Sequence, residues 1–575
     1  MSPERTRNAR LAWRVAIVAG AIAACKATDT ISTNGGVGGP SPLAPGSSQF
    51  VPTGTTVSIP GGTTGGEFVM VVTDTAVDGS AAATAYQIAA TGISVGGTVS
   101  APSASRSSLG SATATRGPSL DFGFAARVNV GAQRVLAPRV AAARQLWVPH
   151  AATSRGMSRS LSSAAPQVGD VITLNVSDNA CDSIQLRGSR IVAIGSQAIV
   201  VEDTLNPSGG FTPADYQRFA ARFDTLVYPL DVSNFGAPAP FGPEGKILLL
   251  FTSAVNALTK ANSESYVGGF FFDRDLYPVA ATTTMDGCLG SNARNMFYLL
   301  APDPTGTVNG NVRRTGFVDS VTTTVLAHEF QHLINASRRL YVNQGAAPFE
   351  VVWLNEGLSH IAEELLFYHE GMSGPKNNLS LTSLRASSKL VSAFNVDQSS
   401  NAGRYQVYLS DPTKNSPIRD DDSLATRGAT WDFLRYLADR KTTGGGTDAS
   451  VWQSLVNSKT TGIANLRQVF GTNLGGLLRD WSVSHYTDDV VTSVSADFSQ
   501  PSWNWHSIYP ALSGNSPYPL KVNQLSTAPA LGSLIPGSAA FYRFSVAGKV
   551  TGTVTLTKSS ATTTGPLQGV IVRLR

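Results

Sequence analysis

The sequence is poor in charged residues, cysteine and histidine. Only 14% of its 575 residues are Asp, Glu, Lys or Arg, and it contains three cysteines and seven histidines. Lys and Arg outnumber Asp and Glu by 44 to 39, but no basic stripe with interleaved aromatic residues appears, so nucleic acid is not an expected partner. No Cys-x-x-Cys motif occurs, which argues against a cysteine-ligated metal. The 42% of hydrophobic residues is enough for a large core, and the length suggests three or four domains.

The N-terminus has the pattern of an export signal. Four arginines, the last of them Arg14, precede an apolar run from Val15 to Ala24 that is too short for a stable membrane anchor. The run ends in Ile22-Ala23-Ala24-Cys25, which resembles the lipobox of bacterial lipoproteins; a plain signal peptide is the alternative. We therefore expect an exported chain, either secreted or held at the outer membrane or cell surface through a lipid on Cys25. In such an oxidising compartment Cys181 and Cys288 can pair, although the sequence alone leaves this open.

The segment from Val325 to Asn335 contains a His-Glu-x-x-His motif in an apolar run of helical length. In a helix, His328 and His332 are four residues apart and project from one face. Two imidazole nitrogens on one face suit a tetrahedral zinc ion, and Glu329 beside them can take a proton from metal-bound water. The alternative is a chance match on an ordinary core helix, so the interpretation depends on a third ligand.

Glu356 is the preferred third ligand. It lies 24 positions after His332, near the start of an apolar-periodic segment that predicts a second helix. His360, one turn later, is the rival. A metzincin pattern is excluded, because Asn335 and Arg338 stand where its glycine and third histidine would be. The expected ligand set is thus His, His and Glu with a fourth position open to water.

Leu326 to Asn335 followed by Trp353 to Ser359 resembles the gluzincin metallopeptidases, and within them is most similar to the hyicolysin-like family of secreted bacterial enzymes. The match extends from about 166 to 510. The resemblance implies a zinc endopeptidase with a cleft between a sheet-containing upper lobe and a helical lower lobe. By position, His328, His332 and Glu356 would bind zinc, and Glu329 would be the catalytic glutamate.

The sequence departs from the gluzincin pattern at two roles. Relatives commonly place a Tyr or His on a later helix as the oxyanion donor, and here Arg427 stands at that place. It is the candidate donor; the alternative is a surface arginine that pairs with Asp420, Asp421 or Asp422. Outside candidates are Tyr405, Tyr408 and His485. Relatives also carry an acid one turn after the ligand glutamate, where this chain has His360; Glu363 or Glu364 could orient a ligand histidine instead, or form a solvated helix face.

The expected fold class is α+β, with a zincin-like peptidase domain flanked by small all-β sandwich modules. Residues 101–165 hold eight arginines against one acid and are interpreted as a linker with one helix near Leu136 to Trp147; a pro-segment or an anionic-surface contact is the alternative. The predicted segments are 1–25 (lipoprotein-type signal), 26–49 (Gly/Ser/Pro tether), 50–100 (small β-sandwich), 101–165 (arginine-rich linker), 166–510 (zinc metallopeptidase domain) and 511–575 (C-terminal β module).

The sequence therefore predicts a surface-tethered zinc endopeptidase that hydrolyses protein or peptide substrates and acts as a monomer. The alternative is a lipoprotein adhesin or binding scaffold built on a peptidase fold, with weak or lost catalysis.

Overall fold

The structure is a computed structural model. It describes residues 41–97, 119–120, 133–134, 136–140, 165–243, 245–263, 265–444, 446–512, 517–559 and 566–575. The predicted signal and the lipid site at Cys25 lie outside these ranges. Within them, no helix is both long enough and apolar enough to cross a membrane. The described part mixes helices with largely antiparallel sheets, in agreement with the α+β prediction.

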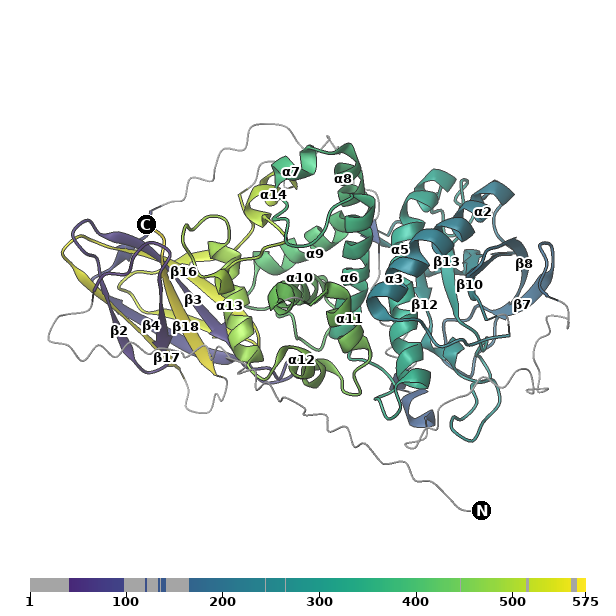
Figure 1. Ribbon diagram of the computed structural model, residues 1–575, viewed down its shortest axis with the longest axis horizontal. Coiled ribbons are helices and arrows are strands. Elements are labelled where there is room, and N and C mark those ends of the chain that lie inside the picture. Colours follow the sequence, from purple (N-terminus) through teal and green to yellow (C-terminus); the bar gives the residue numbers. More distant parts are fainter. Residues whose placement is uncertain are drawn as a thin grey trace, which may run out of the picture. The chain divides into compact units, whose positions relative to one another are not determined.

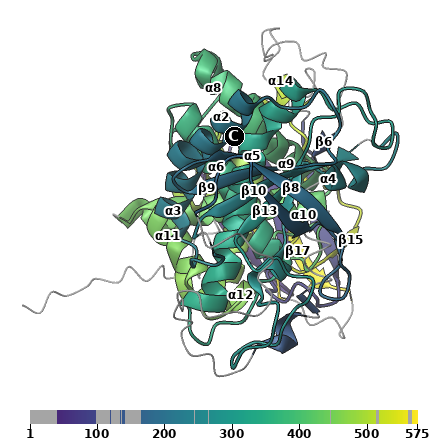
Figure 2. The same ribbon diagram turned by 90° about the vertical axis from the view of Figure 1, so that its right-hand side faces the viewer.

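A six-stranded sheet forms the core of the first lobe, residues 165–342, which we call the sheet lobe. Its strands lie in the order β12-β13-β10-β9-β8-β7. The central strands β9, β10 and β13 run parallel. Every residue of β10 and β13 is buried, as expected for parallel strands covered on both faces. Figure 2 shows β8, β9, β10 and β13 side by side. The bounds are β7 Val171–Asn175, β8 Leu186–Ile194, β9 Ala198–Asp203, β10 Ile247–Thr252, β12 Gly269–Phe271 and β13 Met296–Leu300.

Three helices lie beside this sheet. Helix α2 (Pro213–Arg222) begins at a capping box, in which the side chains of Thr212 and Asp215 bond to each other's backbone N–H. The chain continues into α3 (Tyr228–Phe235), and the long helix α5 (Thr315–Ser337) packs on β12 and β13. In Figure 1 α3 and α5 lie between the sheet and the next group of helices, and α2 lies above the sheet. From 324 to 337 every residue of α5 is buried, so this helix is enclosed on all sides.

The helical lobe, residues 351–512, is built around α6 (Val352–Glu370), α9 (Ser399–Ser410) and α10 (Leu424–Lys441). Two glycines let these helices approach closely. A Cβ on Gly357 would lie 2.5 Å from Thr430 Cγ2, and one on Gly428 would collide with the backbone of Arg404. The other helices are α7 Leu381–Arg385, α8 Ser388–Ala393, α11 Asp448–Val456, α12 Gly462–Phe470, α13 Leu474–Thr487 and α14 Trp505–Leu512.

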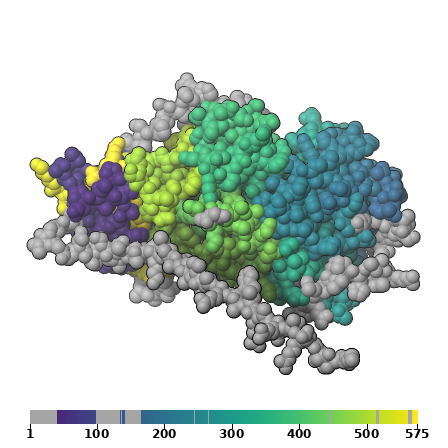
Figure 3. Space-filling view, viewed as in Figure 1, coloured from purple at the N-terminus to yellow at the C-terminus, as the bar shows by residue number. Residues whose placement is uncertain are grey.

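The two ends of the described chain form one β-sandwich. Strand β18 pairs with both β1 and β3, and β17 pairs with both β2 and β4. Figure 1 shows N-terminal strands (purple) interleaved with C-terminal strands (yellow), and in Figure 3 purple and yellow atoms lie side by side. The bounds are β1 Ser48–Pro52, β2 Thr56–Pro60, β3 Gly66–Asp74, β4 Thr84–Thr91, β5 Ser94–Val95, β14 Val522–Gln524, β15 Ala530–Leu534, β16 Ala539–Val546, β17 Thr551–Lys558 and β18 Leu567–Arg573.

The expectation of two separate sandwich modules, at 50–100 and 511–575, is therefore wrong. Alternation of apolar and polar residues tells which face of a strand is buried but not which strand it pairs with. Neither half supplies two complete layers: strands from both halves alternate in each sheet, and the inner faces of the two sheets bury one shared apolar cluster.

The described part of the arginine-rich stretch lies on the sheet lobe. Strand β6 (Ser119–Leu120) pairs in parallel with β11 (Ser265–Tyr266). Gln133 Nε2 donates to Asp273 Oδ2 at 2.6 Å, and Tyr277 Oη donates to the carbonyl of Leu136 at 3.0 Å. The predicted helix is a short 3-10 turn at Ala137–Arg139, and residues 141–147 lie outside the described ranges.

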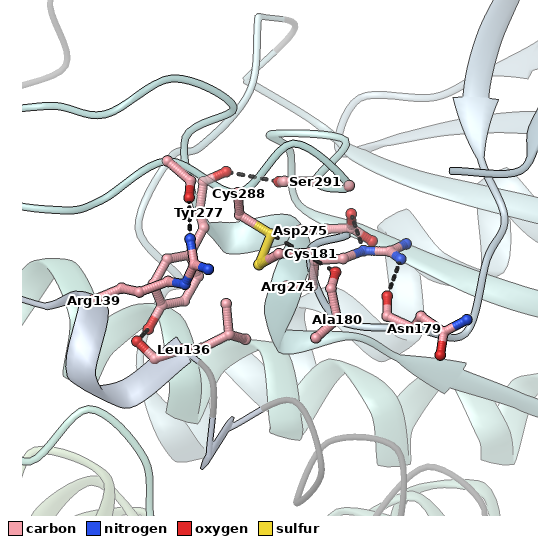
Figure 4. Close-up of a disulfide and its surroundings, with 12 residues drawn as sticks. Leu136, Arg139, Asn179, Ala180, Cys181, Arg274, Asp275, Tyr277, Cys288 and Ser291 are labelled. Carbon is pink, nitrogen blue, oxygen red and sulfur yellow. Dashed lines mark hydrogen bonds and ion pairs between the residues drawn. A yellow bond between two sulfur atoms is a disulfide. The ribbon is translucent and has the colours of Figure 1, made fainter. Parts of the chain in front are cut away.

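Figure 4 shows this contact beside the disulfide Cys181–Cys288, so the pairing that the sequence left open is present. The bridge joins the loop after β7 to the loop before β13, and Ala180 and Tyr277 lie next to it. The sheet lobe is thereby cross-linked where residues 136–139 pack on it.

We expect Leu136→Ala to lower the free energy of unfolding of the sheet lobe by about 2–5 kcal/mol, as for other leucines truncated in a core. Leu136 is 0% exposed and belongs to the main apolar cluster. Urea unfolding followed by fluorescence measures the change. The matched control is Arg134→Ala, two residues earlier and exposed, which should leave the midpoint unchanged. Equal midpoints for both variants would show that this stretch is only a linker.

Candidate metal centre

Helix α5 brings the two histidines of the motif together. His328 and His332 are one turn apart, and their Nε2 atoms lie 3.2 Å from each other. Both side chains are buried. Two adjacent ring nitrogens in an apolar helix environment need either a proton or a cation between them, because two lone pairs facing each other repel.

Glu356, in the second turn of α6, points at the same place. Its Oε2 lies 3.5 Å from His328 Nε2, and its Oε1 lies 3.6 Å from His332 Nε2. The potential ligand atoms of His328, His332 and Glu356 all lie within 4.8 Å of one another. Helices α5 and α6 thus close a His, His, Glu group across the boundary between the lobes.

The group has about the size that a tetrahedral zinc ion needs. With metal–ligand distances of 2.0–2.2 Å, ligand atoms are separated by about 3.3–3.6 Å. The two Nε2 atoms are 3.2 Å apart; His328 Nε2 lies 3.5 Å from Glu356 Oε2, and His332 Nε2 lies 3.6 Å from the other oxygen, Oε1. Among the described residues, Glu356 Oε2 and Glu329 Oε1 are buried without a well-aligned hydrogen-bond partner. Glu356 Oε2 is balanced by an ion pair with Arg427 at 2.7 Å, but a buried oxygen such as Glu329 Oε1 is costly unless another group satisfies it, which is consistent with a cation bound close by.

Residues on α6 hold the outer nitrogens of both histidines. His328 Nδ1 lies 2.7 Å from Glu363 Oε1, and His332 Nδ1 lies 3.0 Å from Ser359 Oγ. Ser359 in turn donates to Gln331 Oε1 at 2.7 Å, so its oxygen is left to accept from His332. An acceptor at Nδ1 keeps the proton there and leaves Nε2 unprotonated, as a metal ligand must be.

This arrangement separates the two acids that the sequence could not tell apart. Glu363 contacts His328, whereas Glu364 pairs with Arg435 at 2.7 Å and accepts from Trp503 Nε1 at 2.9 Å. His360, the rival ligand, turns its Nδ1 to Glu363 at 3.2 Å and groups with His328 and Glu363 rather than with His332. Sequence reasoning did not single out Ser359, because a serine on a helix has no pattern of its own.

Glu329 is held by the neighbouring edge strand. Its Oε2 accepts from the backbone N–H of Phe271 at 2.9 Å, which leaves Oε1 for another partner. Burial raises the pKa of Glu329 to about 7, within the range of a general base at neutral pH. Gly269, in the same strand, allows the close packing there, because a Cβ would lie 2.8 Å from the carbonyl oxygen of Tyr298 and 2.9 Å from Val325 Cγ1 on α5.

The two histidines differ in charge preference. Burial opposes the charged form of His328, but bonds to Glu356 and Glu363 outweigh it and raise its pKa to about 9. Burial lowers the pKa of His332 to about 4. The carboxylates that favour a proton on His328 favour any positive charge at that point, including a metal ion.

Arg427 contacts the group from α10. Its Nη1 lies 2.7 Å from Glu356 Oε2, and its Nε donates to Asp422 Oδ1 at 2.7 Å. The side chain is 1% exposed, so the alternative of a surface arginine is wrong, although the expected aspartate pairing is present. The outside candidates Tyr405, Tyr408 and His485 instead pack against one another in an aromatic cluster with Trp481.

Comparison with known proteins adds a partial similarity. No protein-family model matches the chain. Over 154 residues, 27% of its length, the chain is 28% identical to the neutral metalloprotease ShpI of Staphylococcus hyicus. The aligned part spans 31% of that relative, about a third of its length. The chain is thus similar in part to a metalloprotease; membership of the gluzincins or of the hyicolysin-like family stays a prediction.

Proposed function

We propose that this protein is a zinc-dependent metalloendopeptidase. The observation that carries the proposal is the meeting of His328, His332 and Glu356, with the buried carboxyl of Glu329 on the same helix as the histidines. The partial similarity to a neutral metalloprotease supports it. Zinc suits the donor set, since two imidazoles, one carboxylate and an open fourth position are typical of catalytic zinc sites.

A bound zinc ion would supply a water molecule whose pKa is lowered to roughly 7, together with polarisation of the substrate carbonyl. Glu329 would accept the proton of the attacking water at Oε1 and pass it to the departing amine. Its Oε2 stays on the Phe271 N–H, so the carboxyl keeps its orientation while the proton moves. Glu363 and Ser359 hold the two histidines, and therefore this geometry is preorganised.

Strand β12 would support the catalytic group rather than stand apart from it. It is the last strand of its sheet and pairs with β13 on one side. Its three residues are buried, and the N–H of Phe271 donates to Glu329 Oε2, so the strand fixes the direction of the proposed general base.

We further propose, on the N-terminal sequence alone, that the protein is exported and tethered to the surface through a lipid on Cys25. Its substrates would then be extracellular proteins or peptides.

The test is metal analysis combined with a protease assay on the chain lacking residues 1–25. We expect one zinc ion per chain and cleavage of casein or gelatin, lost on treatment with a chelator and restored by zinc. Zinc binding without cleavage of any protein or peptide substrate would favour the alternative, a binding scaffold on a peptidase fold. Cleavage that survives complete removal of metal would refute the proposal.

A further inference from the structure

Arg427 is a buried cation placed directly against the proposed ligand Glu356. Its position follows from helix packing: Gly357 on α6 lies against Thr430 on α10, and this close approach sets the start of α10 beside Glu356. The guanidinium then lies between two carboxylates, with Nη1 at 2.7 Å from Glu356 Oε2 and Nε at 2.7 Å from Asp422 Oδ1.

The same carboxylate oxygen faces the histidines. Glu356 Oε2 is 2.7 Å from Arg427 and 3.5 Å from His328 Nε2. The contact with Arg427 is an ion pair rather than an aligned hydrogen bond, since neither Glu356 Oε2 nor Arg427 Nη1 has a well-aligned partner among the described residues. The charge of this oxygen is therefore balanced by Arg427, but no aligned hydrogen bond fixes its lone pairs. A metal ion could share the oxygen with Arg427 or take the place of Arg427.

A buried carboxylate without a counter-ion is strongly unfavourable. In a chain without metal, Arg427 balances the negative charge of Glu356. In a chain with metal, the metal ion balances that charge as well. Two positive charges beside one carboxylate repel each other, and this repulsion is only weakly screened in a buried site. A bound metal ion must then weaken the ion pair between Arg427 and Glu356, and by the reciprocity of linked binding this ion pair must weaken the affinity for metal.

We propose that Arg427 is a built-in counter-ion that stabilises the metal-free site and so weakens its affinity for metal. Asp422 shares the guanidinium and moderates this effect, because part of the arginine's charge is balanced there. Arg427 acts through Glu356, so it is a positioning residue, not a catalytic one. The inference rests on the proposed metal site.

The experiment measures zinc dissociation constants by competition with a chromophoric chelator, together with the melting temperature of the metal-free chain. Arg427→Met should bind zinc roughly ten- to hundredfold more tightly, the usual range of coupling between linked ligands. Its metal-free form should melt at a lower temperature, and zinc should raise that temperature more than in the wild type. Arg427→Lys keeps the charge and should stay closer to the wild-type affinity.

Asp422→Asn should act in the opposite direction and weaken zinc binding, because Arg427 is then left to Glu356 alone. The side chain of Asp422 is 21% exposed, so its substitution disturbs the core less than that of Arg427. Asp422→Asn therefore tests the proposal even if Arg427→Met does not fold. The matched control is Arg440→Met on the same helix, whose guanidinium donates to backbone carbonyls; its zinc affinity should not change.

Weaker or unchanged zinc binding in Arg427→Met, or tighter binding in Asp422→Asn, would overturn the counter-ion role. The proposed function fails in a different way, namely if the wild-type chain itself binds no zinc. The two failures are distinguished by the wild-type titration.

Discussion

Glu329→Gln is expected to slow peptide-bond hydrolysis by about 10²- to 10⁴-fold, the usual contribution of a general base, while zinc stays bound. Glutamine has nearly the same shape as glutamate, and its carbonyl oxygen can still accept from the Phe271 N–H. What is lost is a carboxylate oxygen able to take a proton. The loss should appear in kcat/KM for a fluorogenic peptide, with metal content measured on the same sample.

Glu370→Gln is the matched control for this variant. Glu370 ends α6 and is exposed, so the same chemical change there should leave both activity and zinc unaltered. Wild-type activity in Glu329→Gln would remove the glutamate from the mechanism. Loss of zinc together with activity would instead mean that the residue supports the site rather than the reaction.

Glu356→Gln should weaken zinc binding by more than 10- to 100-fold, which is the usual effect of removing a residue that only orients a metal ligand. The amide keeps the volume but removes the negative charge that faces both Nε2 atoms at 3.5 and 3.6 Å. It also leaves Arg427 with only Asp422 as a counter-ion, so the repulsion between arginine and metal increases. Competition titration gives the affinity, and circular dichroism shows whether the fold is kept.

His360→Ala separates the two possible third ligands. His360 contacts Glu363, so its removal should disturb zinc binding only through the orientation of His328, by no more than that 10- to 100-fold range. If His360→Ala loses zinc while Glu356→Gln retains it, the ligand set is His328, His332 and His360.

Much of the site can be predicted because its parts are local. Helical spacing alone places His328 and His332 on one face, and a helix beginning just before Glu356 gives that carboxylate a defined direction. The meeting of the two helices is not local. It depends on packing such as that of Gly357 against Thr430, which no periodicity reveals.

Arg427 shows the limit of assigning a role by position. Its place in the sequence suggests a donor to the substrate, but the nearest groups to its guanidinium are the carboxylates of Glu356 and Asp422. The partner of a buried charge is set by tertiary packing. The same holds for Leu136, whose neighbours in sequence predict a linker although its side chain is in the core.

Strand pairing was the least predictable feature. The stretches from Glu67 to Val72 and from Ala539 to Val546 both show strand patterns, yet nothing in either indicates that β3 and β16 are partners more than 460 residues apart. Long-range pairing is chosen by shape and burial among many strands of similar pattern.

That pairing makes the polypeptide behave as two interlocked pieces. A single cut between β5 and β7 would produce an N-terminal fragment whose strands β1–β4 remain hydrogen-bonded to β15–β18 of the other fragment. The fragments would separate on a denaturing gel but migrate together under native conditions. Whatever is attached to the N-terminus would therefore still hold the sheet lobe and the helical lobe after the backbone between β5 and β7 had been broken.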